Sequence, residues 1–90
     1  MLDVYTEKFT DMLGNPAQML EVSGLPDGCL LGLRDALSSE YGDDTEILIY
    51  RSELDEAGLS ILSNWVDKNA PELKKKMDSS DTIRLFEGSW

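Results

Sequence analysis

The one thiol in this sequence belongs to Cys29, the sole cysteine among 90 residues. The sequence contains no histidine. It therefore cannot form a Ser-His or Cys-His catalytic pair, a zinc site of cysteine and histidine, or a disulfide within the chain. This inventory predicts a protein that is not an enzyme, with no catalytic residues and no cofactor; the alternative is an enzyme that relies on carboxylates brought together by folding.

Cys29 follows Pro26, Asp27 and Gly28 at the start of a predicted helix. Unpaired N–H groups and the helix dipole would favour a thiolate there, so these residues form a candidate helix N-terminal site with Cys29 as the candidate sulfur-carrying thiol. Against this, the carboxylates of Asp27 and Asp35 disfavour a second negative charge, and free cysteines are commonly buried as small apolar groups. The sequence thus favours an inert Cys29 over a reactive one.

Two acidic clusters flank a predicted strand and form a candidate acidic interaction surface. The clusters are Asp43, Asp44 and Glu46 before the strand, and Glu53, Asp55 and Glu56 after it. A strand of six to seven residues would hold them about 20 Å apart, so they cannot form one site. Neither cluster has the spacing of a calcium-binding loop, and we predict no metal site.

The overall charge is strongly negative, with 18 acidic residues, 8 basic residues and a formal net charge of −10. This charge repels nucleic acid and anionic membranes, and it suits a protein partner with a basic surface. The alternative interpretation is that the charge serves solubility alone. The first residues contain no long apolar run, so we expect neither a signal peptide nor a membrane span, and we expect cytoplasmic residence.

The length predicts a single domain over residues 1–90, and 41% hydrophobic residues indicate a folded chain. Apolar residues at helical spacing predict a helix over 2–13, within an N-terminal helical extension at 1–16. A strand is the rival interpretation, because Val4, Tyr5 and Phe9 are good strand formers. The α/β core is then expected at 17–90.

Strands and helices alternate in this core. We predict strands at 18–23, 45–51 and 82–87, and helices at 30–41 and 52–69, the second opened by a Ser52–Asp55 capping pair and closed by Pro71. Residues 72–77 could form either a helix or a strand. The predicted fold class is α/β, an α+β two-layer sandwich with a βαβαββ core.

The segments Leu20-Glu21-Val22-Ser23-Gly24-Leu25 and Leu33-Arg34-Asp35-Ala36-Leu37 resemble the opening strand and first helix of the TusA-like (SirA-like) sulfur-carrier family. The resemblance covers roughly residues 18–88. It implies that both main helices lie on one face of the sheet and that 72–77 is a strand paired with 82–87. The positions that match the family's sulfur-carrying Cys-Pro pair hold Asp27 and Gly28, with Cys29 two residues beyond the first of them.

These observations support two functional hypotheses. The leading one is a non-enzymatic protein-binding module on a TusA-like scaffold, acting as a sulfur carrier or a regulator of a sulfur relay. The alternative is an acidic inhibitor that mimics nucleic acid and blocks the basic surface of a nucleic-acid-binding protein or nuclease. Neither the partner nor the oligomeric state follows from the sequence.

Overall fold

The computed structural model describes residues 2–37, 42–43 and 45–88. In chain order, its elements are β1 (Asp3–Thr10), β2 (Pro16–Leu25), α1 (Cys29–Leu37), β3 (Gly42–Asp43), β4 (Glu46–Tyr50), the 3-10 helix η1 (Arg51–Glu53), α2 (Glu56–Asn69), the 3-10 helix η2 (Pro71–Leu73), α3 (Lys74–Asp78) and β5 (Thr82–Glu87).

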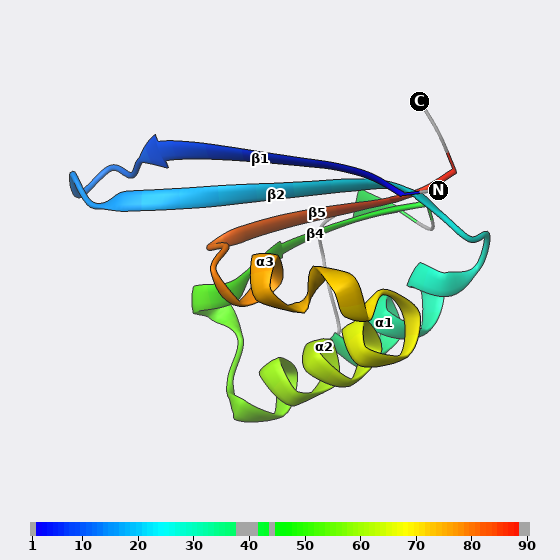
Figure 1. Ribbon diagram of the computed structural model, residues 1–90. Helices are drawn as coiled ribbons and strands as arrows, with labels where there is room; N and C mark the ends of the chain where they lie inside the picture. Colours follow the sequence, from blue (N-terminus) through cyan, green and yellow to red (C-terminus); the bar gives the residue numbers. More distant parts are fainter. Residues whose placement is uncertain (1, 38–41, 44, 89–90) are drawn as a thin grey trace.

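All of the described strands belong to one sheet, in the order β1-β2-β5-β4-β3. The central strands β2 and β5 are parallel, whereas β1 with β2, β4 with β5 and β3 with β4 are antiparallel. Figure 1 shows α1, α2 and α3 on one side of this sheet. The predicted two-layer α+β class is therefore confirmed, with both main helices on the same face.

The N-terminal segment is a strand, so the prediction of a helix over 2–13 was wrong. Residues 3–10 pair with β2 in an uninterrupted antiparallel register from Asp3 opposite Ser23 to Thr10 opposite Pro16. A tight turn makes this hairpin possible, because the Asp11 carboxylate accepts hydrogen bonds from the backbone N–H groups of Leu13 and Asn15. Gly14 completes the turn with a φ of +83°, in the left-handed region that favours glycine.

Residues 72–77, for which helix and strand were both open, are helical. Pro71 begins η2, which leads directly into α3. Leu73 and Met77 lie four residues apart and are both buried, while Lys75 between them is exposed. A strand would have placed all three side chains on one face. The strand that the family resemblance implied at this position is therefore absent, and only 82–87 forms the C-terminal strand.

The second main helix begins later than predicted. Asp55 is itself the N-cap of α2, because its carboxylate accepts a hydrogen bond of 2.8 Å from the N–H of Gly58. Ser52 instead lies in η1. A carboxylate at the N-cap satisfies an unpaired N–H and suits the positive end of the helix dipole. The predicted end of this helix before Pro71 is confirmed.

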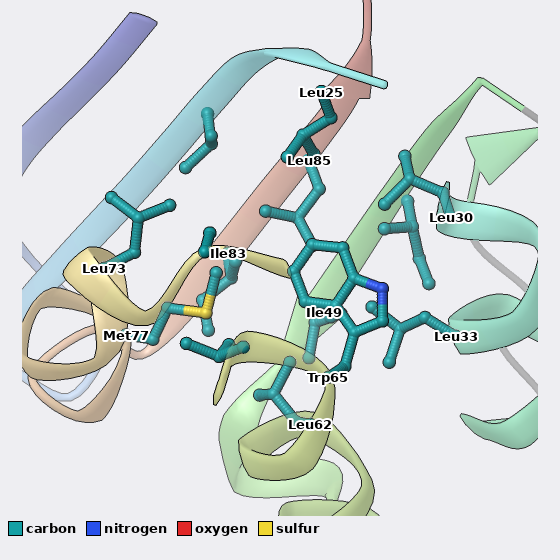
Figure 2. Packing of buried hydrophobic residues seen from close by; sticks show 14 of the residues in the cluster. Leu25, Leu30, Leu33, Ile49, Leu62, Trp65, Leu73, Met77, Ile83 and Leu85 are labelled. Atoms are coloured by element: carbon teal, nitrogen blue, oxygen red, sulfur yellow. The ribbon is translucent and has the colours of Figure 1, made fainter. Parts of the chain in front are cut away.

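The core lies between the sheet and the helices, and the indole of Trp65 on α2 packs within it (Figure 2). The sheet contributes alternate residues of its three central strands, namely Leu20, Val22, Ile83, Leu85, Ile47 and Ile49. Since side chains alternate between the faces of a strand, the residues between these positions point away from the helices. On this second face of the sheet Tyr5, Phe9 and Tyr50 are exposed, whereas the other large exposed apolar residues lie elsewhere, namely Val4, Met12, Leu13 and Leu31.

Candidate functional site

Cys29 begins α1, as the sequence predicted, and it follows a turn made by the candidate residues Pro26, Asp27 and Gly28. The N–H of Cys29 donates to the carbonyl oxygen of Pro26 at 3.2 Å, which closes the turn. Gly28 has a φ of +85°, which a residue with a side chain adopts only with strain. The Cys29 side chain is half-buried and packs against the hydrophobic core.

The N-terminus of α1 already holds a carboxylate from another part of the chain. The Glu87 side chain, at the end of β5, accepts a hydrogen bond of 3.1 Å from the N–H of Leu30. On the α2 side, the indole N–H of Trp65 donates to the carbonyl oxygen of Cys29 at 2.9 Å. Glu87 therefore takes the position at the helix N-terminus from which a sulfur anion would otherwise benefit.

The surroundings of Cys29 raise its pKa above the ordinary value for a thiol. Burial is the main cause, followed by the negative charge of Glu87 and then that of Asp27, while a backbone hydrogen bond acts in the opposite direction. Asp27 acts as predicted, but the stronger carboxylate is Glu87 and not Asp35. At neutral pH the thiol is therefore held in its protonated, weakly nucleophilic form.

Alkylation kinetics test this description of Cys29. We expect Glu87→Gln to lower the pKa of the Cys29 thiol and to raise its alkylation rate at pH 7 about 3-fold or more, because a negative charge is removed while a side-chain acceptor for Leu30 remains. In the wild type the rate should rise with pH through the elevated pKa. Iodoacetamide labelling followed by mass spectrometry measures both effects.

Asp35→Asn is the matched control for that experiment, since it removes an exposed carboxylate of the same helix, and it should leave the rate unchanged. Wild-type protein should also gain no sulfur on Cys29 after incubation with a persulfide donor. A stable persulfide at neutral pH would contradict the view that Glu87 and burial keep this thiol inert.

The predicted acidic clusters lie at opposite ends of β4. Asp43 belongs to β3 and Glu46 begins β4, where its carboxylate pairs with Arg84; Asp44 lies outside the described residues. At the far end, Glu53 lies in η1, Asp55 caps α2 and Glu56 occupies the first helical turn. As predicted, the two clusters do not form one site, and Asp55 serves the helix.

A different surface gathers aromatic and acidic side chains, namely the face of the sheet that points away from the helices. We call it the open face. The strand register places on it, strand by strand, Asp3, Tyr5, Glu7 and Phe9 of β1; Met19, Glu21 and Ser23 of β2; Thr82, Arg84 and Phe86 of β5; and Glu46, Leu48 and Tyr50 of β4.

Charged side chains cross the middle of the open face. The guanidinium of Arg84 bridges the neighbouring strands, with 3.0 Å to the Glu21 carboxylate and 3.1 Å to that of Glu46. It also lies over the ring of Phe86, 5.1 Å from the centroid. The two carboxylates raise the pKa of Arg84, Glu46 more strongly than Glu21. An acid–base–acid row with excess negative charge thus joins β2, β5 and β4.

The aromatic side chains around this row are accessible. Tyr5 is 53% exposed, Phe9 42% and Tyr50 37%, and the exposed surface of Tyr5 and Phe9 is available for contact with a partner. A shallow hollow near the start of β1 is lined in part by Asp3, Tyr5 and Glu21. Its mixture of carboxylate and aromatic surface suits a lysine or arginine side chain, which pairs with acids and stacks on rings.

Sequence reasoning missed the open face because Tyr5, Glu7 and Phe9 were assigned to a helix. On a helix, Tyr5 and Phe9 share a face from which Glu7 points away, whereas on a strand all three share one face. The alternative strand interpretation, followed through, would have found this grouping. No spacing in the sequence signals the approach of Glu87 to α1.

No family model, no curated protein and no solved structure matches this chain. The TusA-like scaffold therefore stays a prediction. Among the described residues, no group of three or more His, Cys, Asp or Glu side chains could hold a metal ion. None of the helices in the described ranges has the length and apolar character needed to cross a membrane.

Proposed function

We propose that this domain is a non-enzymatic protein-binding module that binds a basic region of a protein partner through the open face of its sheet. The observation that carries the proposal is the combination on one face of exposed Tyr5 and Phe9 with carboxylates. Aromatic residues are enriched at protein interfaces, and a negative surface accelerates encounter with a positive one.

The charge of the whole chain supports the same partner chemistry. The formal charge is −10, and on the open face Asp3 and Glu7 add to the acidic residues around Arg84. An anionic partner would meet repulsion on this face, whereas lysine and arginine side chains would find both carboxylates and rings. Inhibition of a nucleic-acid-binding protein is the alternative role that the same charge suits.

Sulfur transfer is not included in the proposed function. A carrier thiol needs an accessible thiolate at a helix N-terminus, where its charge is stabilised. Here the Glu87 carboxylate occupies that position, and burial raises the pKa of the Cys29 thiol. The alkylation experiment above tests the point independently of any binding partner.

Affinity capture with matched variants tests the proposed function. Immobilised wild-type protein, a Tyr5→Ala/Glu7→Lys double variant and a Glu53→Lys control are each exposed to lysate of the cells that produce the protein. Proteins retained by wild type and control, but lost about 10-fold or more with the open-face variant, should be basic and should elute with salt. Added nucleic acid that displaces them would indicate the inhibitor role.

The result that would contradict the proposal is equal retention by wild type and the open-face variant, or retention only of acidic or salt-insensitive partners. Glu53→Lys makes the comparison informative, because Glu53 is exposed in η1, off the open face. It carries the same charge reversal as Glu7→Lys. A loss caused by net charge alone would therefore appear equally in both variants.

A further inference from the structure

The strand β1 forms one edge of the sheet, and it is long, regular and exposed. Its eight residues are all exposed, and its register with β2 runs without a bulge from Asp3 to Thr10. The opposite edge, β3, is described as two residues, Gly42–Asp43. Figure 1 shows β1 outermost, with its hairpin extending beyond the helices.

Edge strands of soluble proteins are normally protected by prolines, bulges, short length or charged side chains, above all lysines, because their unpaired N–H and C=O groups attract further strands. β1 contains no proline and no bulge, and Lys8 is its lone basic residue. An edge so little protected is a ready template for an added strand. This observation is independent of the acidic and aromatic character of the open face.

We propose that β1 takes up an extended segment of a basic partner protein as an additional strand of the sheet. The proposal rests on the proposed function and gives it a binding mode. Backbone hydrogen bonds along the outer edge of β1 would supply affinity. The side chains of the added segment that lie beside Asp3, Tyr5, Glu7 and Phe9 would supply specificity.

The alternation of β1 predicts the sequence of the segment. On the open face, Asp3 and Glu7 favour lysine or arginine opposite them, and the rings of Tyr5 and Phe9 accept the same cations. On the other face, Val4 and Thr6 favour β-branched neighbours. The segment should therefore alternate basic with β-branched residues.

A second copy of this chain would fit the edge less well. Two copies would bring two charges of −10 together. In an antiparallel β1–β1 pair with two-fold symmetry, residues of the same face oppose each other. Centring that pair on Glu7 sets two carboxylates opposite each other, and centring it on Tyr5 sets Asp3 against Glu7. Centring it on Thr6 sets no like charges opposite each other.

A capped eight-residue peptide that alternates arginine with valine is the probe, with a glutamate-for-arginine peptide as its control. Amide hydrogen exchange of ¹⁵N-labelled protein is followed by NMR as the peptide is added. We expect the outward-pointing amides of β1 to become protected at least about 10-fold, and the control peptide to protect none. Replacing alternate valines of the probe with proline should abolish the protection.

Variants of the chain locate the peptide along the open face. Glu7→Lys should weaken peptide binding about 10-fold, and Tyr5→Ala about 3- to 5-fold. Glu53→Lys is the matched control for Glu7→Lys, since it makes the same charge reversal at an exposed residue of η1, off the open face. It should leave the peptide affinity unchanged.

The possible failures are distinguishable. One failure is peptide binding that leaves the β1 amides unprotected and that Tyr50→Ala, on the open face away from β1, weakens as much as Tyr5→Ala does. This result would overturn the proposal that the segment adds to β1 as a strand. The proposed function would still stand. Failure of every basic probe, with no effect of open-face variants in affinity capture, would reject both. A dimer in analytical ultracentrifugation, with β1 amides protected before peptide is added, would assign the edge to a second copy and overturn this inference.

Discussion

Replacing Leu85 with alanine is expected to lower the free energy of unfolding by about 3 to 5 kcal/mol. Leu85 is completely buried, and its strand β5 has a neighbouring strand on each side, with Val22 and Ile47 as its cross-strand partners. Because strands and helices surround the site, the structure cannot collapse into the cavity that the substitution leaves. Urea unfolding followed by circular dichroism measures the loss.

Leu31→Ala is the matched control for Leu85→Ala, because Leu31 lies on α1 with half of its surface exposed. It should cost less than about 1 kcal/mol, since little apolar surface returns to water and alanine favours helices. Equal effects of the two substitutions would show that β5 is not the centre of the core. If the free energy of unfolding of the wild type is smaller than the expected loss, the Leu85→Ala variant will be unfolded. Leu85→Val, which removes less of the side chain, then gives a smaller loss that can be measured.

Two substitutions of Trp65 separate the contribution of its packing to stability from that of its indole hydrogen bond. Trp65→Ala should cost about 3 to 5 kcal/mol, because it removes the large ring that packs between α1, α2 and the sheet (Figure 2). Trp65→Phe keeps most of the packing but leaves the Cys29 carbonyl without the indole N–H. The phenylalanine variant should therefore cost about 1 to 2 kcal/mol.

The two Trp65 variants also differ in where they act. If the indole N–H holds the start of α1, Trp65→Phe should speed hydrogen exchange of the first amides of α1 more than that of the β4 amides. Urea unfolding gives the free energies, and NMR gives the exchange rates. A phenylalanine variant as stable as wild type, with unchanged exchange in α1, would show that the hydrogen bond contributes nothing.

Local patterns predicted the central strands well. The strand at 82–87 is β5 as predicted, and the apolar run Ile47-Leu48-Ile49 lies in β4. Pro71 ends α2 because a proline disfavours the helical conformation of the residue before it. Trp65, assigned to the core from its place on an apolar helical stripe, is indeed buried there. These features depend on neighbours within a few residues along the chain.

The N-terminal segment was misassigned because the spacing of its aromatic residues fits both the period of a helix and that of a strand. Tyr5 and Phe9 are four residues apart, which suits one helical face, and an even number apart, which suits one strand face. What decides between them is the turn at Asp11, whose carboxylate binds two backbone N–H groups, and the pairing partner that this turn supplies. Pairing with β2 then outweighs local preference.

The Glu87 contact lay beyond sequence reasoning for a different reason. Glu87 and Leu30 are separated by 57 positions. They meet because β5 runs parallel to β2, so that the end of β5 lies beside the end of β2, just before α1 begins. Only the strand order reveals that this carboxylate reaches the helix. The candidate thiol was thus found from the sequence, while the group that restrains it was not.

The central position of β5 also bears on how the chain matures as it leaves the ribosome. β5 joins β2 on one side to β4 on the other, yet of the strands that the structure describes it is the last to be synthesised. Until β5 emerges, no strand connects the hairpin of β1 and β2 to β4. The apolar residues of β2 and β4 then lack their cross-strand neighbours on β5. Acquisition of the native state is therefore expected to be a late, nearly all-or-none event that depends on contacts distant in sequence.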